Sequence, residues 1–277
     1  MTKTTGVVFK TLKYLFMLLA VLVALFPFFW ILLSSFRTNA EILSGSLALP
    51  STFSFIGYRQ ALEISPIITY FFNSVIVAGF TTILNVLFVA MAAYVFARFE
   101  FRGKTALYLT LSLSLVIPMT ALIHPVYVII HGMGLADSKA GLILVYIALN
   151  LPLSLLVLKA SFHAVPKGLE EAAYVDGAGF VRTFFQIILP CSKAGLVCAA
   201  ILAFLGSWNE FTFALILTTS QSARTLPLSF AYFTSQFSFN YTALFAAITM
   251  AIVPSIAVFA IFQERVVGSL TAGAMKE

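Results

Sequence analysis

Charged residues are scarce in this sequence. Asp, Glu, Lys and Arg together make up 9% of the 277 residues, and only 10 residues are acidic. Soluble domains carry about a quarter charged residues, so the scarcity excludes an ordinary soluble globular protein. Hydrophobic residues reach 61% and the mean hydropathy is +1.04. This composition is typical of an integral membrane protein, to which the usual relation between chain length and number of soluble domains does not apply.

Cysteine is nearly absent as well, with only Cys191 and Cys198 in the chain. Their spacing on one predicted helix separates them by roughly 10 Å along its axis. That separation excludes a disulfide between them. We interpret both as small apolar packing residues.

Long apolar runs take the place of these missing residues. A transmembrane helix needs about 20 mostly apolar residues. Six stretches qualify, at about 14–36, 70–97, 105–130, 140–159, 194–217 and 243–262. The first run is longer than the apolar core of a signal peptide and has no prompt cleavage pattern, so we expect an uncleaved anchor. The sequence predicts an all-α, polytopic membrane protein with a single transmembrane domain over residues 1–277.

The basic residues are unevenly divided among the predicted loops. If the N-terminus lies inside the cell, four Lys or Arg residues fall outside and the other twelve of the 16 fall inside. The outer four are Arg37, Arg59, Lys139 and Arg224. Cytoplasmic loops carry such an excess, so we expect both termini to be cytoplasmic. Because the net charge of +6 is spread over short loops, we expect no nucleic-acid partner.

Three of the ten acids lie in one segment, residues 168–190, with the sequence GLEEAAYVDGAGFVRTFFQIILP. Pro166 suits a first helical turn, where the helix dipole favours Glu170 and Glu171. Gly177 and Gly179 permit a bend before a second helix. The apolar residues of that helix have helical spacing, and its end is predicted at a proline: Phe180, Phe184, Ile187, Ile188 and Pro190. We predict two short helices within a cytoplasmic loop, 166–190.

The first of these helices has two interpretations on physical grounds. Ala172 and Ala173 would allow another backbone to approach closely, and the acids would pair with arginine. The helix is then a docking surface. It is equally well an ordinary amphipathic surface loop with acids that match the helix dipole.

A resemblance bears on this choice. Glu171-Ala172-Ala173, Gly177, Ile187 and Leu189-Pro190 stand at the spacing of the EAA motif, and the segment resembles that of ATP-binding-cassette importer permeases. The resemblance implies that 166–190 contains a coupling helix, which docks on a cytoplasmic ATPase subunit. The residues it assigns to this coupling are Glu170, Glu171, Ala172, Ala173, Asp176 and Gly177.

Three further stretches are similar to the carbohydrate-uptake branch of these permeases. They are YVFARFEFRGK at 94–104, WNEF at 208–211 and GSLTAGAMKE at 268–277. More narrowly, the chain resembles the smaller permease of maltose-type importers. The resemblance implies the type I importer permease fold in a bacterial inner or plasma membrane. It implies four kinds of partner: a second homologous permease, an ATPase dimer that binds ATP and Mg, a solute-binding protein and the lipid bilayer. It further implies that 268–277 reaches the ATPase and that the outer loop 218–241 enters the binding protein.

The chain itself is not expected to bind a cofactor. Gly103-Lys104-Thr105 ends like a phosphate-binding loop, but that motif requires glycine where Arg98 stands. We therefore expect ATP and Mg to be bound only by the partner ATPase, and no metal site or catalytic residue in this chain.

Polar residues within the predicted spans are candidates for a substrate path. Glu210 is the acid within a long apolar run, where ionisable groups are costly and usually face a cavity or a partner. With Trp208 and Asn209 it either lines a sugar path or helps to pack the partner permease. Asn73, like Asn85 on the same span, is either an interhelical hydrogen-bond partner or a sugar contact. Prolines in the third span are expected to kink it.

Two other functions remain open. An intramembrane aspartyl enzyme would need embedded aspartates, whereas Asp137 and Asp176 fall in loops, and the His-Glu-x-x-His pattern of metal enzymes is absent. A secondary transporter often has duplicated halves, and no repeat is visible. The energy source distinguishes these alternatives from an ATP-driven importer.

Overall fold

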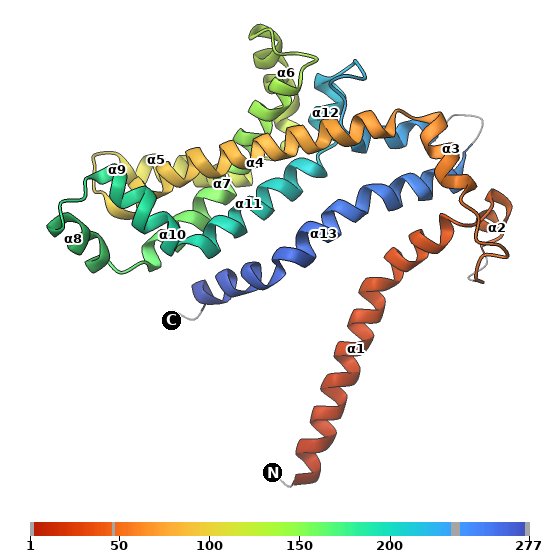
Figure 1. Ribbon diagram of the computed structural model, residues 1–277, viewed down its shortest axis with the longest axis horizontal. Coiled ribbons are helices and arrows are strands. Elements are labelled where there is room, and N and C mark those ends of the chain that lie inside the picture. The colour runs from red at the N-terminus through yellow and green to blue at the C-terminus, as the bar shows by residue number, and fades with distance from the viewer. Residues whose placement is uncertain (1–2, 46–47, 234–238, 275–277) are drawn as a thin grey trace. The chain divides into compact units, whose positions relative to one another are not determined.

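The computed structural model describes residues 3–45, 48–233 and 239–274, with side chains between 9 and 261. Every regular element in these ranges is helical (Figure 1). Four helices are long and apolar enough to cross a membrane. They are Phe9–Ser34 within α1 (Lys3–Ser34), α4 (Ile67–Arg98), α7 (Lys139–Ala164), and Tyr241–Ile261 within α13 (Tyr241–Ala274). These four coincide, within a few residues at their ends, with the predicted first, second, fourth and sixth spans.

The predicted third span, 105–130, is not one helix. It consists of α5 (Lys104–Leu113), η1 (Ser114–Val116), η2 (Met119–Leu122) and α6 (Ile123–Gly132). Its halves meet at 106°. The bend follows from Pro118, because the residue before a proline is pushed out of the helical region, and Ile117 is extended with ψ 121°. The expected kink is therefore a sharp break, which a count of apolar residues does not detect.

The predicted fifth span, 194–217, was also wrong as a continuous helix. α11 (Lys193–Trp208) ends at Trp208, and α12 (Thr212–Leu217) starts after a short break. α11 forms a second bent pair with Phe180–Cys191, at 79°. Counting each bent pair as one crossing gives up to six spans.

Pro190 does not end the helix before α11 as predicted. It lies in the first turn of α10 (Leu189–Cys191), where a proline needs no hydrogen-bond donor. The helical path breaks instead at Ser192, with φ −98° and ψ 18°.

Contacts within the chain divide it into two compact units, and the single transmembrane domain over 1–277 stays a prediction. The first unit comprises 1–67 and 229–252, and the second comprises 68–228 and 253–277. The first holds α1, α2 (Asn39–Leu43), α3 (Ile56–Ile64) and the start of α13, while η4 (Leu226–Phe233) crosses the boundary. Within the first unit, Thr242 Oγ1 donates to the carbonyl of Arg37, and a Cβ on Gly57 would lie 2.8 Å from Thr242 Cγ2.

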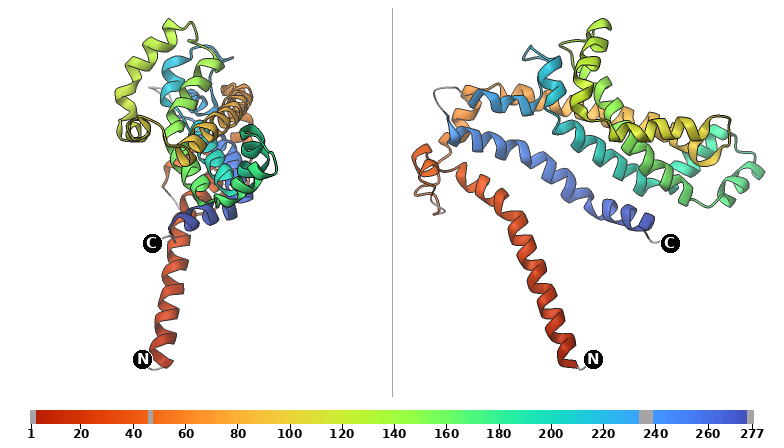
Figure 2. Two further views of the ribbon diagram at one scale, coloured as in Figure 1. Left: turned by 90° about the vertical axis from the view of Figure 1, so that its left-hand side faces the viewer. Right: turned by 180° about the vertical axis from the view of Figure 1, so that it is seen from behind.

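The second unit contains the core. α4, α7 and α11 run side by side (Figures 1 and 2). Their shared apolar cluster includes Val89, Tyr94, Leu155, Phe162 and Ala199. Glycines allow α7 and α11 to approach closely, since a Cβ at Gly195 would collide with Ser161 and one at Gly206 would lie 2.7 Å from Asn150 Oδ1. Small residues at such crossings are typical of helix packing in membranes.

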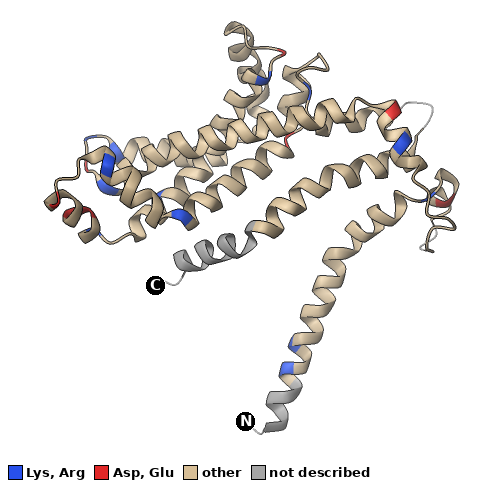
Figure 3. Ribbon diagram, viewed as in Figure 1, with Lys and Arg blue, Asp and Glu red and all other residues tan. Residues whose placement is uncertain are grey.

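Charged residues gather toward the helix ends, and the middle of the long helices is largely free of them (Figure 3). At one end of the second unit, Lys104 pairs with Glu100 at 2.7 Å, and Lys159 Nζ lies 3.3 Å from the Tyr108 ring centroid. At the other end, Lys139 bonds the carbonyl of Ser222. Within the second unit, Lys104 and Lys159, predicted to be cytoplasmic, thus lie at one end, and Lys139, predicted to be external, lies at the other.

Candidate functional site

The acidic segment folds as α8 (Gly168–Val175), followed by a bend and a second helical stretch. Glu170 and Glu171 lie in the first turn of α8, as predicted from the helix dipole. Gly177 has φ +79°, a left-handed conformation that glycine adopts without strain. There the amide of Gly177 donates to Tyr174 O and that of Ala178 to Ala173 O, which ends the helix.

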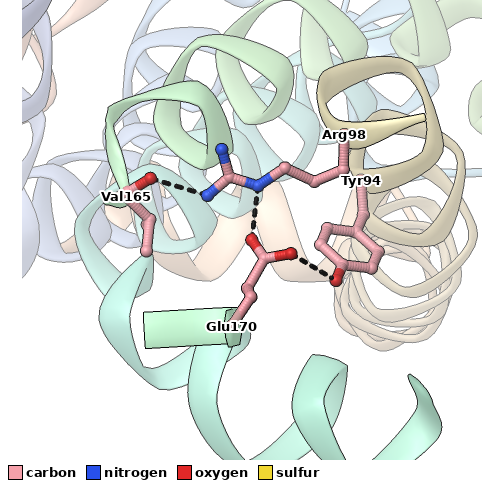
Figure 4. Close-up of polar contacts among 4 residues, drawn as sticks. All are labelled: Tyr94, Arg98, Val165 and Glu170. Carbon is pink, nitrogen blue, oxygen red and sulfur yellow. Dashed lines mark hydrogen bonds and ion pairs between the residues drawn. The ribbon is translucent and has the colours of Figure 1, made fainter. Parts of the chain in front are cut away.

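One face of α8 packs against the rest of the second unit through a buried polar cluster. Glu170 and Ala173 are the buried residues of α8. Glu170 Oε1 lies 2.5 Å from Arg98 Nε, and its Oε2 accepts a 3.1 Å hydrogen bond from the Tyr94 hydroxyl (Figure 4). The Arg98 contact has the distance of an ion pair but not hydrogen-bond alignment. We treat it as electrostatic attraction in a site where both side chains are about nine-tenths buried.

Arg98 has a further partner in the same cluster. Its Nη2 donates a 2.6 Å hydrogen bond to the carbonyl of Val165, the residue that caps the end of α7 (Figure 4). The planar guanidinium can reach two acceptors from fixed positions, which an ammonium group cannot do in the same way. Arg98 thus joins the end of α4 to both α7 and α8.

The opposite face of α8 is open. Glu171, Ala172, Asp176 and Gly177 are exposed, and Val175 is 87% exposed. Of the six residues assigned to ATPase coupling, these four are exposed, whereas Glu170 and Ala173 are buried against the chain itself. Their role in coupling stays a prediction. Sequence reasoning grouped all six because a motif pattern does not reveal which helical face is buried.

The second helical stretch packs against the same cluster. It comprises α9 (Phe180–Thr183), the π-helix η3 (Phe184–Ile188) and α10. Phe184 and Ile188 are buried as their spacing suggested, whereas Phe180 is exposed. The Tyr94 ring centroid lies 5.0 Å from that of Phe184 and 5.6 Å from that of Phe180. Tyr94 therefore meets both parts of the acidic segment.

The residues predicted for a substrate path differ in burial and in their contacts. Trp208 is buried, with its ring against Phe71 and stacked on Phe204. Asn209 is exposed, and its Nδ2 donates to Leu205 O at 2.9 Å. Glu210 is not inside a helix as expected; it lies in the break between α11 and α12.

Glu210 accepts three hydrogen bonds at this break. The donors are the Tyr146 hydroxyl at 2.7 Å, the Phe213 amide at 2.8 Å and the Ala214 amide at 3.1 Å. The carboxylate thus caps the start of α12, where a negative charge is favoured. It also joins α12 to α7 through Tyr146.

The two span-two asparagines both bond other parts of the second unit. Asn73 is buried; its Nδ2 donates to the carbonyls of Gln221 and Arg224, and its Oδ1 accepts from Lys139 Nζ. Asn85 Nδ2 donates to Ile147 O of α7 at 3.1 Å. Of the two roles left open, these contacts favour interhelical and loop bonding over a sugar contact.

Sequence reasoning missed Tyr94, Arg98 and Tyr146. Tyr94 and Arg98 lay within a quoted motif, and their i, i+4 spacing places them on one helix face, but nothing in that stretch identifies Glu170 as their partner. Among the residues that the structure describes, no three His, Cys, Asp or Glu side chains are grouped to hold a metal ion.

Comparisons with known proteins give a consistent result. Residues 86–271 match the family described as "Binding-protein-dependent transport system inner membrane component". The chain is 37% identical over 270 residues to the diacetylchitobiose uptake system permease protein NgcG of Streptomyces coelicolor, covering 97% of this chain and 89% of that protein. It is 38% identical over 255 residues to the trehalose transport system permease protein SugB of Mycobacterium tuberculosis, covering 91% and 93%.

The fold has a counterpart among solved structures. It matches a crystal structure of a bacterial ABC transporter involved in the import of the acidic polysaccharide alginate, with a TM-score of 0.81. The match covers 95% of this chain and 98% of that chain at 20% sequence identity. At that identity the likeness establishes the fold.

Proposed function

Because the chain belongs to the family of binding-protein-dependent transport system inner membrane components, we propose that it forms one side of the membrane path of an ATP-driven carbohydrate importer. NgcG and SugB are named for diacetylchitobiose and trehalose, both disaccharides. That shared chemistry supports a mono- or oligosaccharide as the substrate class. Family membership favours this function over a secondary transporter or an intramembrane enzyme.

The two-faced α8 is the observation that carries the coupling role. Its inner face is fixed by Glu170, and its outer face presents Glu171, Ala172 and Val175. An exposed acid beside small and apolar residues suits a protein partner with an arginine near an apolar cleft. We infer that this partner is a cytoplasmic ATPase subunit, which binds ATP and Mg.

The remaining partners follow from the same proposal. A second, homologous permease completes the path, and a solute-binding protein delivers substrate at the end where Lys139 and Arg224 lie. The excess of basic residues at the α8 end supports a cytoplasmic location for it. Closure of the ATPase dimer moves α8 and shifts the path between two states, while this chain performs no covalent chemistry.

Charge reversal on the open face of α8 tests the coupling role. We expect Glu171→Arg to leave membrane insertion intact but to weaken association with the ATPase at least about tenfold, because it places like charges together at the interface. Co-purification of the ATPase with the tagged permease, together with uptake by proteoliposomes, measures both effects.

A matched control is available in α3. Glu63 is also an exposed glutamate, with a 60% exposed side chain in a surface pair with Arg59. It lies on the side proposed to be external, so Glu63→Arg should leave ATPase association at the wild-type level. Equal association and uptake in Glu171→Arg and wild type would falsify the assignment of α8.

A further inference from the structure

α8 packs on the rest of the second unit through one of its faces. Of its eight residues, Glu170 and Ala173 are the buried ones. An alanine methyl group makes few contacts, so the polar cluster of Glu170, Arg98 and Tyr94 is the main lateral attachment of this helix. Arg98 is the last residue of α4 and Tyr94 lies one turn before it.

We propose that this cluster is the joint through which movement of α8 is passed to α4, with Arg98, Glu170 and Tyr94 as positioning residues. The inference rests on the proposed coupling role of α8, and it specifies which transmembrane helix receives the movement. A buried ion pair transmits displacement in both directions, because separating its charges in a poorly solvated site is costly.

α4 is suited to carry the movement across the membrane. It is one unbroken helix of 32 residues, whereas the third and fifth crossings are bent by 106° and 79°. No proline interrupts it, so a proline kink, a common cause of sharp bends in helices, is absent from α4.

The far end of α4 is attached to the outer loop. Asn73 bonds the carbonyls of Gln221 and Arg224, and Ser74 Oγ accepts from the Leu226 amide at 2.8 Å. Asn73 and Arg98 are 25 residues apart, which is roughly 37 Å along the helix axis. A displacement at α8 therefore has a continuous route along one helix to 221–226, on the side proposed for the solute-binding protein.

Arginine is required at position 98 by the geometry. Its Nε faces Glu170 while its Nη2 bonds Val165 O, so one rigid group holds both α8 and the end of α7. Lysine keeps the positive charge but cannot reproduce both contacts. If the joint depends on both contacts of the guanidinium, Arg98→Lys should disrupt it even though the positive charge is conserved.

The test uses the complete complex in proteoliposomes, with Arg98→Lys and Glu170→Gln. We expect each variant to retain its ATPase subunits within about twofold, and to continue hydrolysing ATP. The amount of sugar transported per ATP hydrolysed should fall at least about tenfold, because ATPase subunits that are no longer coupled to the permease still hydrolyse ATP. A role limited to stability would lower the amount of complex without changing this ratio.

The ion pair of Lys104 and Glu100 supplies a matched control. It lies at the same end of the second unit, with an N–O distance of 2.7 Å, but the Glu100 side chain is 88% exposed. Lys104→Gln should leave transport per ATP unchanged, because exposed pairs contribute little. If Arg98→Lys fails to insert, Tyr94→Phe removes one hydroxyl from the joint and should still lower the ratio by about threefold.

The outcomes separate this inference from the proposed function. Normal transport per ATP in correctly assembled Arg98→Lys, Glu170→Gln and Tyr94→Phe contradicts the joint but leaves the docking role of α8 intact. An ATPase that stays bound and coupled in Glu171→Arg contradicts the docking role itself. A lowered ratio in the joint variants, with Lys104→Gln unaffected, supports the assignment of α4.

Discussion

At the residue scale, Glu210 illustrates how a half-buried acid can be stabilised without a substrate. Its carboxylate accepts from the Tyr146 hydroxyl and from the amides of Phe213 and Ala214. These donors compensate for the loss of water around a charged group in an apolar region. Asn150 and Ser207 extend the polar contacts between α7 and α11 with a 3.2 Å hydrogen bond. We infer that Glu210 fixes the break between α11 and α12.

Glu210→Gln tests this structural role. The amide retains one acceptor oxygen but loses the charge and one set of lone pairs, so we expect a loss of about 1–3 kcal/mol in stability. The midpoint of thermal unfolding of the detergent-solubilised complex should fall by a few degrees, while the substrate concentration for half-maximal uptake stays the same. Tyr146→Phe should produce a smaller fall. A large change in that concentration with unaltered unfolding would instead support a place for Glu210 in the substrate path.

At the element scale, the loop between α6 and α7 holds the start of the outer loop. Asp137 has φ 53°, a left-handed conformation uncommon outside glycine. Its Oδ1 accepts hydrogen bonds from the Thr219 and Ser220 amides, and from the Ser220 hydroxyl. Its own amide donates to Leu217 O at 2.8 Å. Two loops that are far apart in sequence therefore form one platform.

These contacts predict a specific pH response. The hydrogen bond from the Ser220 amide, followed by that from Thr219, lowers the pKa of Asp137 below its ordinary value. A lowered folded-state pKa means that this stabilisation is complete above the unfolded value, about 3.9, and is lost as the pH falls through the folded value. The amide protection factors of Thr219 and Ser220 should therefore be constant from pH 8 to pH 5.

Hydrogen exchange of Asp137→Asn at neutral pH measures the same contacts directly. We expect several-fold lower protection at 219–220, because a neutral amide oxygen is a weaker acceptor than a carboxylate. Glu100→Gln is the control: the hydrogen bond from Lys104 lowers the pKa of Glu100 too, but at the other end of the unit. Wild-type protection in Asp137→Asn would show that the platform is held by other contacts.

The helices also show how much of the fold could be predicted from the sequence. Apolar run length located the four helices that are long enough to cross a membrane, because the thickness of a bilayer sets a minimum length. It did not locate the breaks at Ile117 and after Trp208, since hydropathy carries no information about the direction of a helix axis. The first break has a local cause in Pro118. At the second, Glu210 accepts hydrogen bonds from two nearby amides and from Tyr146, a residue distant in sequence.

The candidate site was predictable to a similar degree. The motif located α8 and the bend at Gly177, which need only local spacing and a glycine. The inward turn of Glu170 was not predictable, because it depends on Arg98, 72 residues earlier, across the packed ends of α4 and α7. Pairings of this kind can be recognised only in the three-dimensional structure. The motif therefore grouped residues that lie on two different faces of α8.

At the scale of the whole molecule, the chain is a multi-pass membrane permease of the binding-protein-dependent transport family. The tail at 268–277 lies beyond the described side chains, and the outer loop is described apart from 234–238. Their expected contacts with the ATPase and the binding protein remain predictions. The central claim is that movement enters from an ATP-consuming partner through α8.

Uptake of a labelled disaccharide into proteoliposomes containing the complete complex and its binding protein tests this claim most directly. With ATP on the α8 side, we expect uptake to continue after a protonophore collapses the proton gradient, and to stop when ATP is replaced by a non-hydrolysable analogue. Uptake by the purified chain alone, driven by a proton gradient in the absence of ATP, would contradict the account.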